Sequence, residues 1–150
     1  MAIHYLEDFV AGERFGGAMR VRIEAERIKS FAAEFDPQPF HLDEQAARGS
    51  LFAGLAASGW HTAAVTIRLI VGSDLSPAGG VIGASFDEFR WPRPVRPGDE
   101  LRVEMEILEV RASKSRPEQG MVKARTTTLN QRDEVVQLSV VNLVVARRPA

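Results

Sequence analysis

The chain has 150 residues, of which 45% are hydrophobic and 26% charged, so it can bury one core of ordinary size and is expected to form a single domain, residues 1–150. Its formal net charge of −1 gives no reason to expect binding to nucleic acid or to an anionic membrane. The lack of cysteine excludes disulfides, a thiolate nucleophile and cysteine metal sites, and it is compatible with a reducing cytoplasm.

The sequence contains no segment typical of export or of membrane insertion. Residues 1–8 include acidic side chains where a signal peptide would need a basic start and an apolar run. The longest apolar-rich stretch, residues 60–71, is interrupted by polar and charged residues and is too short to span a bilayer. We therefore expect a small soluble protein of the cytoplasm.

The first half of the chain has mostly helical periodicity. Residues 19–23 alternate as in a short strand, and a helix then begins near Glu24. This helix ends at about Asp36, because the residue before a proline is displaced from helical geometry. Its apolar face contains Ile28, Phe31, Ala32 and Phe35.

Two more helices are expected before residue 72. Asp43 is placed to cap a short helix over residues 44–48, and Ser58 to cap a helix that continues to Val71. The second of these is apolar over most of its surface, apart from Arg68. We therefore expect it to lie inside the core.

From Gly80 onward the sequence predicts strands, at residues 81–90, 100–113, 121–130 and 134–146. The alternation slips by one residue between Leu101 and Val110, which indicates a bulge. Polar turns separate successive strands, so the sheet is expected to be antiparallel. The predicted fold class is α+β, with an antiparallel sheet wrapped around one central apolar helix on its concave face.

The segment Asp36-Pro37-Gln38-Pro39-Phe40-His41 carries the most specific signal for chemistry. Two prolines stiffen what we expect to be an extended turn, which would hold a carboxylate and an imidazole at a nearly constant separation. Histidine is suited to proton transfer at neutral pH, and a carboxylate beside it can orient it. Asp36 and His41 are therefore candidate acid–base residues, although Asp before Pro is also a common structural turn.

A second signal is Ser58-Gly59 at the start of the longest apolar helix. The first N–H groups of a helix lack partners within it, and the helix dipole places partial positive charge there. Gly59 would let a ligand approach this backbone closely, so the helix start could bind a carbonyl oxygen that becomes negative during a reaction. An ordinary cap followed by a glycine needed for packing explains the same residues.

The proline-rich segment of residues 89–99 ends one strand and turns into the next at Pro97-Gly98-Asp99. Its three arginines, Arg90, Arg93 and Arg96, could contact the phosphates of a bound cofactor. A solvated loop accounts for any one of them equally well.

Taken together, these segments resemble the MaoC-like dehydratase family, the single-hot-dog relatives of (R)-specific enoyl-CoA hydratases. The family pattern is Asp-x-Asn-Pro-x-His, then a small residue followed by Gly at a helix start, then a Phe-x-x-Pro-Val-x-Pro-Gly-Asp type turn. Here the order is Asp36 to His41, then Ala57-Ser58-Gly59, then Phe89 to Asp99, and the spacings match across most of the chain.

The resemblance implies a hot-dog fold and hydration of a trans-2-enoyl-CoA to a 3-hydroxyacyl-CoA in fatty acid metabolism, with no cofactor besides the CoA of the substrate. Asp36 and His41 would be the catalytic pair, and Gly59 with Ser58 would bind the thioester oxygen. Gln38 and Trp60 would also border the substrate. Hot-dog sheets pair into dimers, so a homodimer or a larger homo-oligomer is implied.

The chain departs from the family at two positions. Gln38 replaces the usual Asn, and Ala64 stands where some relatives have a serine about five residues after the helix glycine. Any support that this serine gives to the aspartate must then come from Thr62 or Ser58.

Two other functions remain open: an acyl-CoA thioesterase and a non-catalytic acyl-CoA binding protein. Hot-dog thioesterases usually carry a carboxylate on the central helix, and residues 60–71 contain none. His4 is expected to have no function, and His61 could either face the site or pack against a loop. Without clustered His and carboxylate residues, no metal site is expected.

Overall fold

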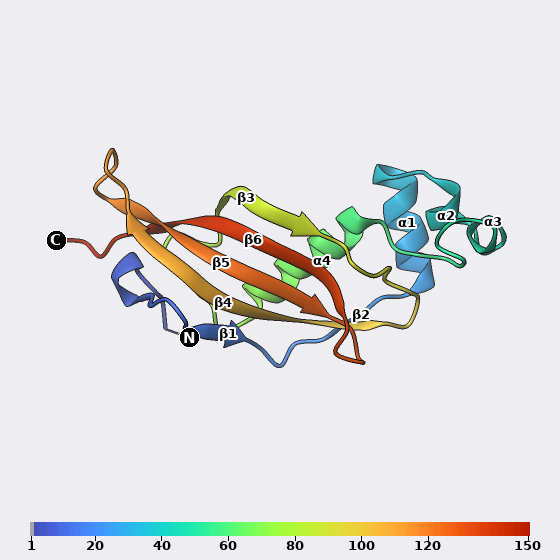
Figure 1. Cartoon of the computed structure of the whole chain (residues 1–150), viewed down its shortest axis with the longest axis horizontal. Coiled ribbons are helices and arrows are strands. Elements are labelled where there is room, and N and C mark those ends of the chain that lie inside the picture. Colours follow the sequence, from blue (N-terminus) through green and yellow to red (C-terminus); the bar gives the residue numbers. More distant parts are fainter. Residues whose placement is uncertain (1) are drawn as a thin grey trace.

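The computed structural model describes residues 2–150, which form one antiparallel sheet, one long helix against it and a group of short helices (Figure 1). A 3-10 turn, η1 (Leu6–Asp8), precedes the rest. The strands are β1 (Arg14–Gly16), β2 (Val21–Arg22), β3 (Gly83–Arg90), β4 (Glu100–Ala112), β5 (Gln119–Leu129) and β6 (Val135–Ala146). The helices are α1 (Ala25–Phe35), α2 (Pro39–Leu42), α3 (Glu44–Arg48) and α4 (Gly59–Val71).

The sheet has the strand order β1-β4-β5-β6-β3, with β2 paired to another part of β4. All pairings are antiparallel, as expected for long strands joined by short turns. The register of β4 against β5 shifts between Ile107 and Glu109, which confirms the predicted bulge. β1, only three residues long, was missed in the sequence.

Helix α4 runs along the sheet, and the strands curve past it (Figure 1). Residues of its inner face, such as Leu69 and Ile70, are buried together with inward-facing strand residues such as Leu101, Ile107 and Val122. This is the predicted α+β arrangement of a helix on the concave face of a sheet.

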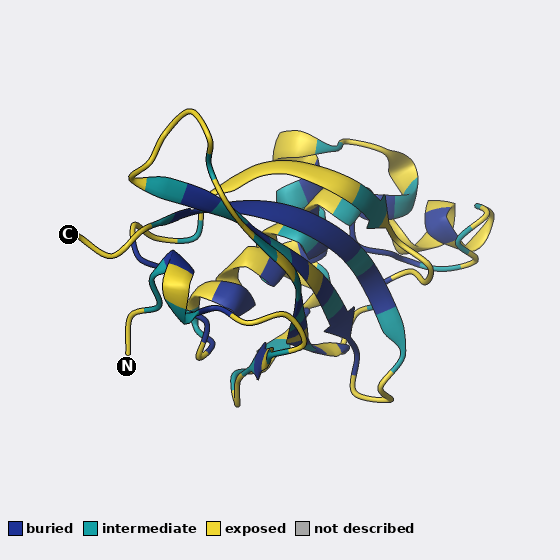
Figure 2. Cartoon of the chain, turned by 60° about the vertical axis from the view of Figure 1, so that its left-hand side comes forward, coloured by how far each residue is buried: buried dark blue, intermediate teal, exposed yellow. Residues whose placement is uncertain are grey.

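The expectation that α4 is buried all round was wrong. Its outer face exposes Trp60, Ile67 and Val71, and beside it the edge strand β3 exposes Phe86, which is 54% accessible. Most of β3 is exposed, as its colour in Figure 2 shows. One side of the helix packs on the sheet, and within residues 2–150 no other layer covers the opposite side. We call the exposed surface formed by Trp60, Ile67, Val71 and Phe86 the apolar stripe.

Helices α1, α2 and α3 stand beyond one end of the sheet and lead into the start of α4 (Figure 1). α1 ends at Phe35 and Asp43 caps α3 through its side chain, as predicted. The extended turn predicted for residues 36–41 was wrong from Pro39 onward, because α2 begins there. Proline is favoured in the first turn of a helix, where its missing N–H removes no hydrogen bond.

Among the described residues, no helix has both the length and the apolar composition needed to cross a bilayer.

Candidate active site

The end of α1 positions Asp36. Its backbone N–H closes the helix on Ala32, and its backbone then leaves helical geometry at φ −151° and ψ 67°. The side chain is 18% exposed and accepts a hydrogen bond at each oxygen. Gln38 Nε2 donates to Oδ1 at 2.5 Å, and Ser58 Oγ donates to Oδ2 at 2.7 Å. The longer amide at position 38, where the family pattern has Asn, therefore holds the Asp36 carboxylate through a hydrogen bond.

His41 lies in α2 with a side chain that is only 5% exposed. Its Nδ1 is 2.6 Å from the carbonyl oxygen of Ala56. A carbonyl can only accept, so Nδ1 carries a proton and Nε2 is the nitrogen that can take up or release one. Nε2 is 3.3 Å from Asp36 Oδ2, so the structure brings the predicted pair together.

The rings of Phe40 and Phe52 pack against His41 and restrict the rotation of its imidazole. The Phe40 ring meets the imidazole edge-on at 4.6 Å between centroids, and Phe52 lies 5.8 Å away. An orienting carbonyl and two aromatic neighbours therefore hold the Nε2 atom toward Asp36.

The electrostatic surroundings of Asp36 favour its charged form. Partial burial by itself would raise the pKa of this carboxyl. The hydrogen bonds from Gln38 and Ser58, with a smaller contribution from His41, outweigh burial and hold the pKa below its usual range. Asp36 is therefore a carboxylate at neutral pH.

Ser58 links the carboxylate to the start of α4. Its fully buried hydroxyl donates to Asp36 and accepts from the backbone N–H of Trp60, which caps the helix. The N–H groups of His61 and Thr62 bond to the Ser58 carbonyl. Within residues 2–150 the Gly59 N–H has no hydrogen bond, so it is the free donor of the first turn.

Gly59 is also required by packing. A Cβ atom on it would lie 2.7 to 2.8 Å from ring atoms of Trp91, well inside normal contact distance. The Trp91 indole N–H donates to Gln137 Oε1 at 2.9 Å, which fixes the ring over the helix start. Sequence reasoning assigned no role to Trp91. The exposed Trp60 ring meets it edge-on at 5.2 Å between centroids.

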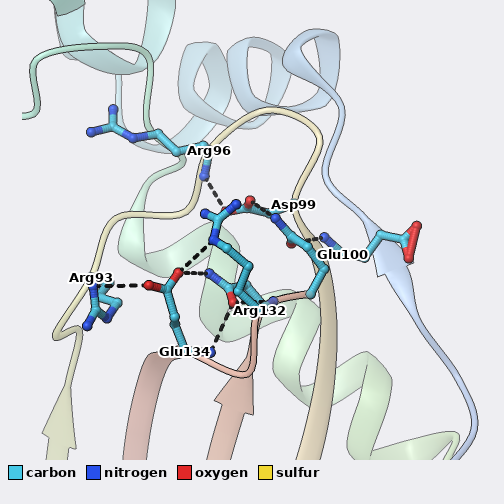
Figure 3. A network of polar contacts seen from close by, with 8 residues as sticks. Arg93, Arg96, Asp99, Glu100, Arg132 and Glu134 are labelled. Carbon is cyan, nitrogen blue, oxygen red and sulfur yellow. Dashed lines mark hydrogen bonds and ion pairs between the residues drawn. The ribbon is translucent and has the colours of Figure 1, made fainter.

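The three arginines of residues 89–99 differ in what they contact. Arg90 pairs with Glu88, and Arg93 lies 3.4 Å from Glu134 (Figure 3). Both side chains are more than half exposed and remain candidates for phosphate contact. Arg96 instead donates to backbone carbonyls of the preceding loop, those of Phe52, Gly54 and Leu55, while its own N–H donates to Asp99.

Arg96 therefore holds the loop before α4 in place. A phosphate would have to compete with three carbonyls for its guanidinium.

His61 packs rather than reacts in this arrangement. Its ring stacks on Phe31 at 4.8 Å with an interplanar angle of 10°. Burial, with a contribution from the charge of Arg27, lowers the pKa of His61, so the ring is neutral at pH 7. His4, which was expected to have no function, packs between the rings of Phe9 and Phe15. No group of three or more metal-binding side chains occurs within the described part of the chain.

The arrangement can therefore move a proton and bind a negative oxygen at one place. A carboxylate and a tautomer-fixed imidazole share a proton site at Nε2, and a free backbone N–H lies at the positive end of α4.

Comparison of the sequence with known families matches residues 8–130 to the MaoC-like domain. Among curated proteins, the chain is 28% identical over 142 residues to the uncharacterized protein YdeM of Bacillus subtilis, covering 95% of this chain and 99% of that one. It is 40% identical over 68 residues to a mesaconyl-CoA hydratase of Cereibacter sphaeroides. That match covers 45% of this chain and only 19% of the relative.

Two solved structures resemble the fold over nearly the whole chain. A MaoC-like dehydratase from Rhodospirillum rubrum is 60% identical, with a TM-score of 0.93 over 98% of this chain and 99% of that one. The R-hydratase PhaJ1 of Pseudomonas aeruginosa is 25% identical, with a TM-score of 0.70 over 97% of this chain and 86% of that one.

Proposed function

Because the chain belongs to the family of the MaoC-like domain, a family of hot-dog proteins, we propose that it adds water to the double bond of a trans-2-enoyl-CoA and catalyses the reverse dehydration. The observation that carries this proposal is the contact of Asp36 with His41 Nε2 at 3.3 Å, next to the start of α4. Hydratases among the proteins of similar sequence and structure support the same chemistry.

In the proposed hydration, Asp36 and His41 hold one water molecule over C3 of the enoyl group. The pair removes a proton from this water as its oxygen bonds to C3. The electrons of the double bond move toward the thioester oxygen, and the pair then returns the proton to C2. Asp36 and His41 act as one coupled unit in which the proton is exchanged at Nε2.

The thioester oxygen gains negative charge when water adds, and the Gly59 N–H is the proposed donor to it. That N–H is free, and it lies where the helix dipole places positive charge. We propose that Trp60, in the first turn of α4, and Gln38, in the loop before α2, also border the substrate. Arg90 and Arg93 are the proposed phosphate contacts of CoA, since both are exposed.

We also propose that the functional form is a homodimer in which a second copy covers the apolar stripe. Trp60 and Val71 are each 61% exposed on α4, and β3 leaves one backbone edge unpaired in the described chain. Exposed apolar side chains beside an open strand edge favour pairing with another sheet. The acyl group would then lie along the boundary between subunits.

The test is to add purified protein to crotonyl-CoA, and then to longer trans-2-enoyl-CoAs, while following enoyl absorbance and free thiol. Loss of the enoyl signal with formation of 3-hydroxyacyl-CoA is the expected result. Release of free thiol with the double bond intact would instead identify a thioesterase. If neither signal changes over the panel, the chain is not an enoyl-CoA hydratase.

A further inference from the structure

A cavity of about 340 Å³ lies between α4 and the concave face of the sheet, on the side of β3. α4 forms one wall through Ala63 and Thr66, and Phe86 and Phe89 of β3 form another. No charged side chain lines it within the described residues. Its size and mostly apolar lining are typical of a site for a small organic group.

The floor of this cavity is polar where a core would normally be apolar. Thr126, Ser139 and Gln137 line the cavity on adjacent strands. Thr126 faces Ser139 as a direct cross-strand partner, and Gln137 faces Thr128, which lies beside the floor without lining the cavity. All four residues are at most 3% exposed, and alternation along each strand directs them to the concave face. Four buried polar side chains side by side in a hydrophobic layer need hydrogen-bond partners.

Part of this floor is satisfied by the protein itself. Thr66 Oγ1 lies 2.7 Å from Thr128 Oγ1, and Gln137 Nε2 donates to Thr66 at 3.3 Å. The hydroxyl of Thr126, which lines the cavity, has no partner among the described residues. A buried hydroxyl without a partner is destabilising unless a ligand or solvent supplies one.

The same network connects the cavity with the reacting groups. Gln137 accepts from the indole N–H of Trp91, and the Trp91 ring lies against Gly59. Thr66 is seven residues beyond Gly59 on α4, about 10 Å along a helix that rises 1.5 Å per residue. An acyl chain whose thioester is bound at Gly59 would therefore reach the cavity with its distal carbons.

We propose that this cavity selects enoyl-CoA substrates whose acyl chain carries an uncharged oxygen, a hydroxyl or a carbonyl, which hydrogen-bonds to Thr126. This inference rests on the proposed hydratase activity and narrows its substrate class. A carboxylate at the same place is disfavoured, since the lining offers no cation to pair with it. An unsubstituted alkyl chain fits the apolar walls but leaves the Thr126 hydroxyl unpaired.

The test compares kcat/KM for trans-2-enoyl-CoAs with acyl chains of six, eight and ten carbons. Each chain length is supplied in three forms: unsubstituted, with a terminal hydroxyl, and with a terminal carboxylate. At the best length, wild type should prefer the hydroxylated chain by about tenfold, the effect of about one net hydrogen bond. In Thr126→Val the preference should fall about tenfold, while the protein still folds, because valine has nearly the same shape.

Thr127→Val is the matched control, since the next residue on β5 points to the other face of the sheet and should leave the preference unchanged. If Thr126→Val does not fold, Ser139→Ala replaces it, because Ser139 faces Thr126 on the cavity floor. Equal rates on plain and hydroxylated chains in wild type would overturn the inference and leave the hydratase proposal standing. A preference that survives in a folded Thr126→Val, or in Ser139→Ala where that variant replaces it, would also overturn the inference. Failure to hydrate any member of the panel would instead refute the proposed function.

Discussion

The hydroxyl of Ser58 makes two hydrogen bonds, and Ser58→Ala would remove both. One stabilises the carboxylate of Asp36 at 2.7 Å, and the other caps α4 through the Trp60 N–H at 3.2 Å. A hydrogen bond to a charged group contributes about 1.5 to 3 kcal/mol. A helix N-cap contributes about 1 kcal/mol. The free energy of unfolding should therefore fall by about 2.5 to 4 kcal/mol, the sum of these two contributions.

Urea denaturation followed by far-UV circular dichroism measures this change. Asp43→Ala is the matched control, because Asp43 caps α3 without contacting Asp36 and should cost only about 1 kcal/mol. A double-mutant cycle of Ser58→Ala with Asp36→Ala isolates the bond between the two side chains. A coupling near zero, or a loss no larger than that of Asp43→Ala, would refute the reasoning.

The same substitution should change the pH dependence of activity. A hydrogen bond from Ser58 helps to lower the pKa of Asp36, so removing it raises that pKa. The acid limb of kcat/KM, which reports the free enzyme, should then move to higher pH. The stability that the lowered pKa provides is present above the pKa of an unfolded aspartate and is lost as pH falls through the folded value. An acid limb that does not move in Ser58→Ala would contradict this assignment.

Three further outcomes are expected. Gly59→Ala should cost about 1 to 3 kcal/mol of stability through overpacking against Trp91, and Trp91→Ala in the same chain should relieve the clash, as thermal unfolding would reveal. His61→Phe should make the free energy of unfolding less sensitive to acid. The pKa of His61 is lowered in the folded protein, so wild type loses stability as pH falls below about 6.5. An equal loss of stability in His61→Phe would contradict the burial of His61 as a neutral ring. Arg96→Ala should lower the free energy of unfolding by about 1 to 3 kcal/mol, measured by urea denaturation, because the substitution leaves loop carbonyls unpaired. An unchanged urea midpoint together with a raised KM would instead identify Arg96 as a CoA contact.

The local elements were predictable wherever the signal lies within a short segment. Asp43 and Ser58 cap the helices that the sequence assigned to them, and the slip in alternation before Val110 corresponds to a real bulge. The pairing of Asp36 with His41 followed from their spacing and from the family resemblance. In each case the residues that decide the geometry are close together in the chain.

Features that depend on distant partners were not predictable from one sequence. β1 is three residues long and exists because β4 lies beside it. The exposed side of α4 has the same apolar composition as a buried one, so periodicity did not separate them. Trp91 reaches Gly59 from 32 positions along the chain, and only the folded structure brings its ring to the helix start.

The central claim, that Asp36 and His41 form the reacting pair, is tested most directly by the hydration rate of Asp36→Asn and His41→Ala on the enoyl-CoA that wild type uses best. Both variants should keep the wild-type circular dichroism spectrum and lose about 10²- to 10⁴-fold in kcat, as expected when a positioned acid–base group is removed. The double variant should lose little more than either single one, because the two side chains act as a unit. A folded variant of either residue that retains wild-type kcat would contradict the account.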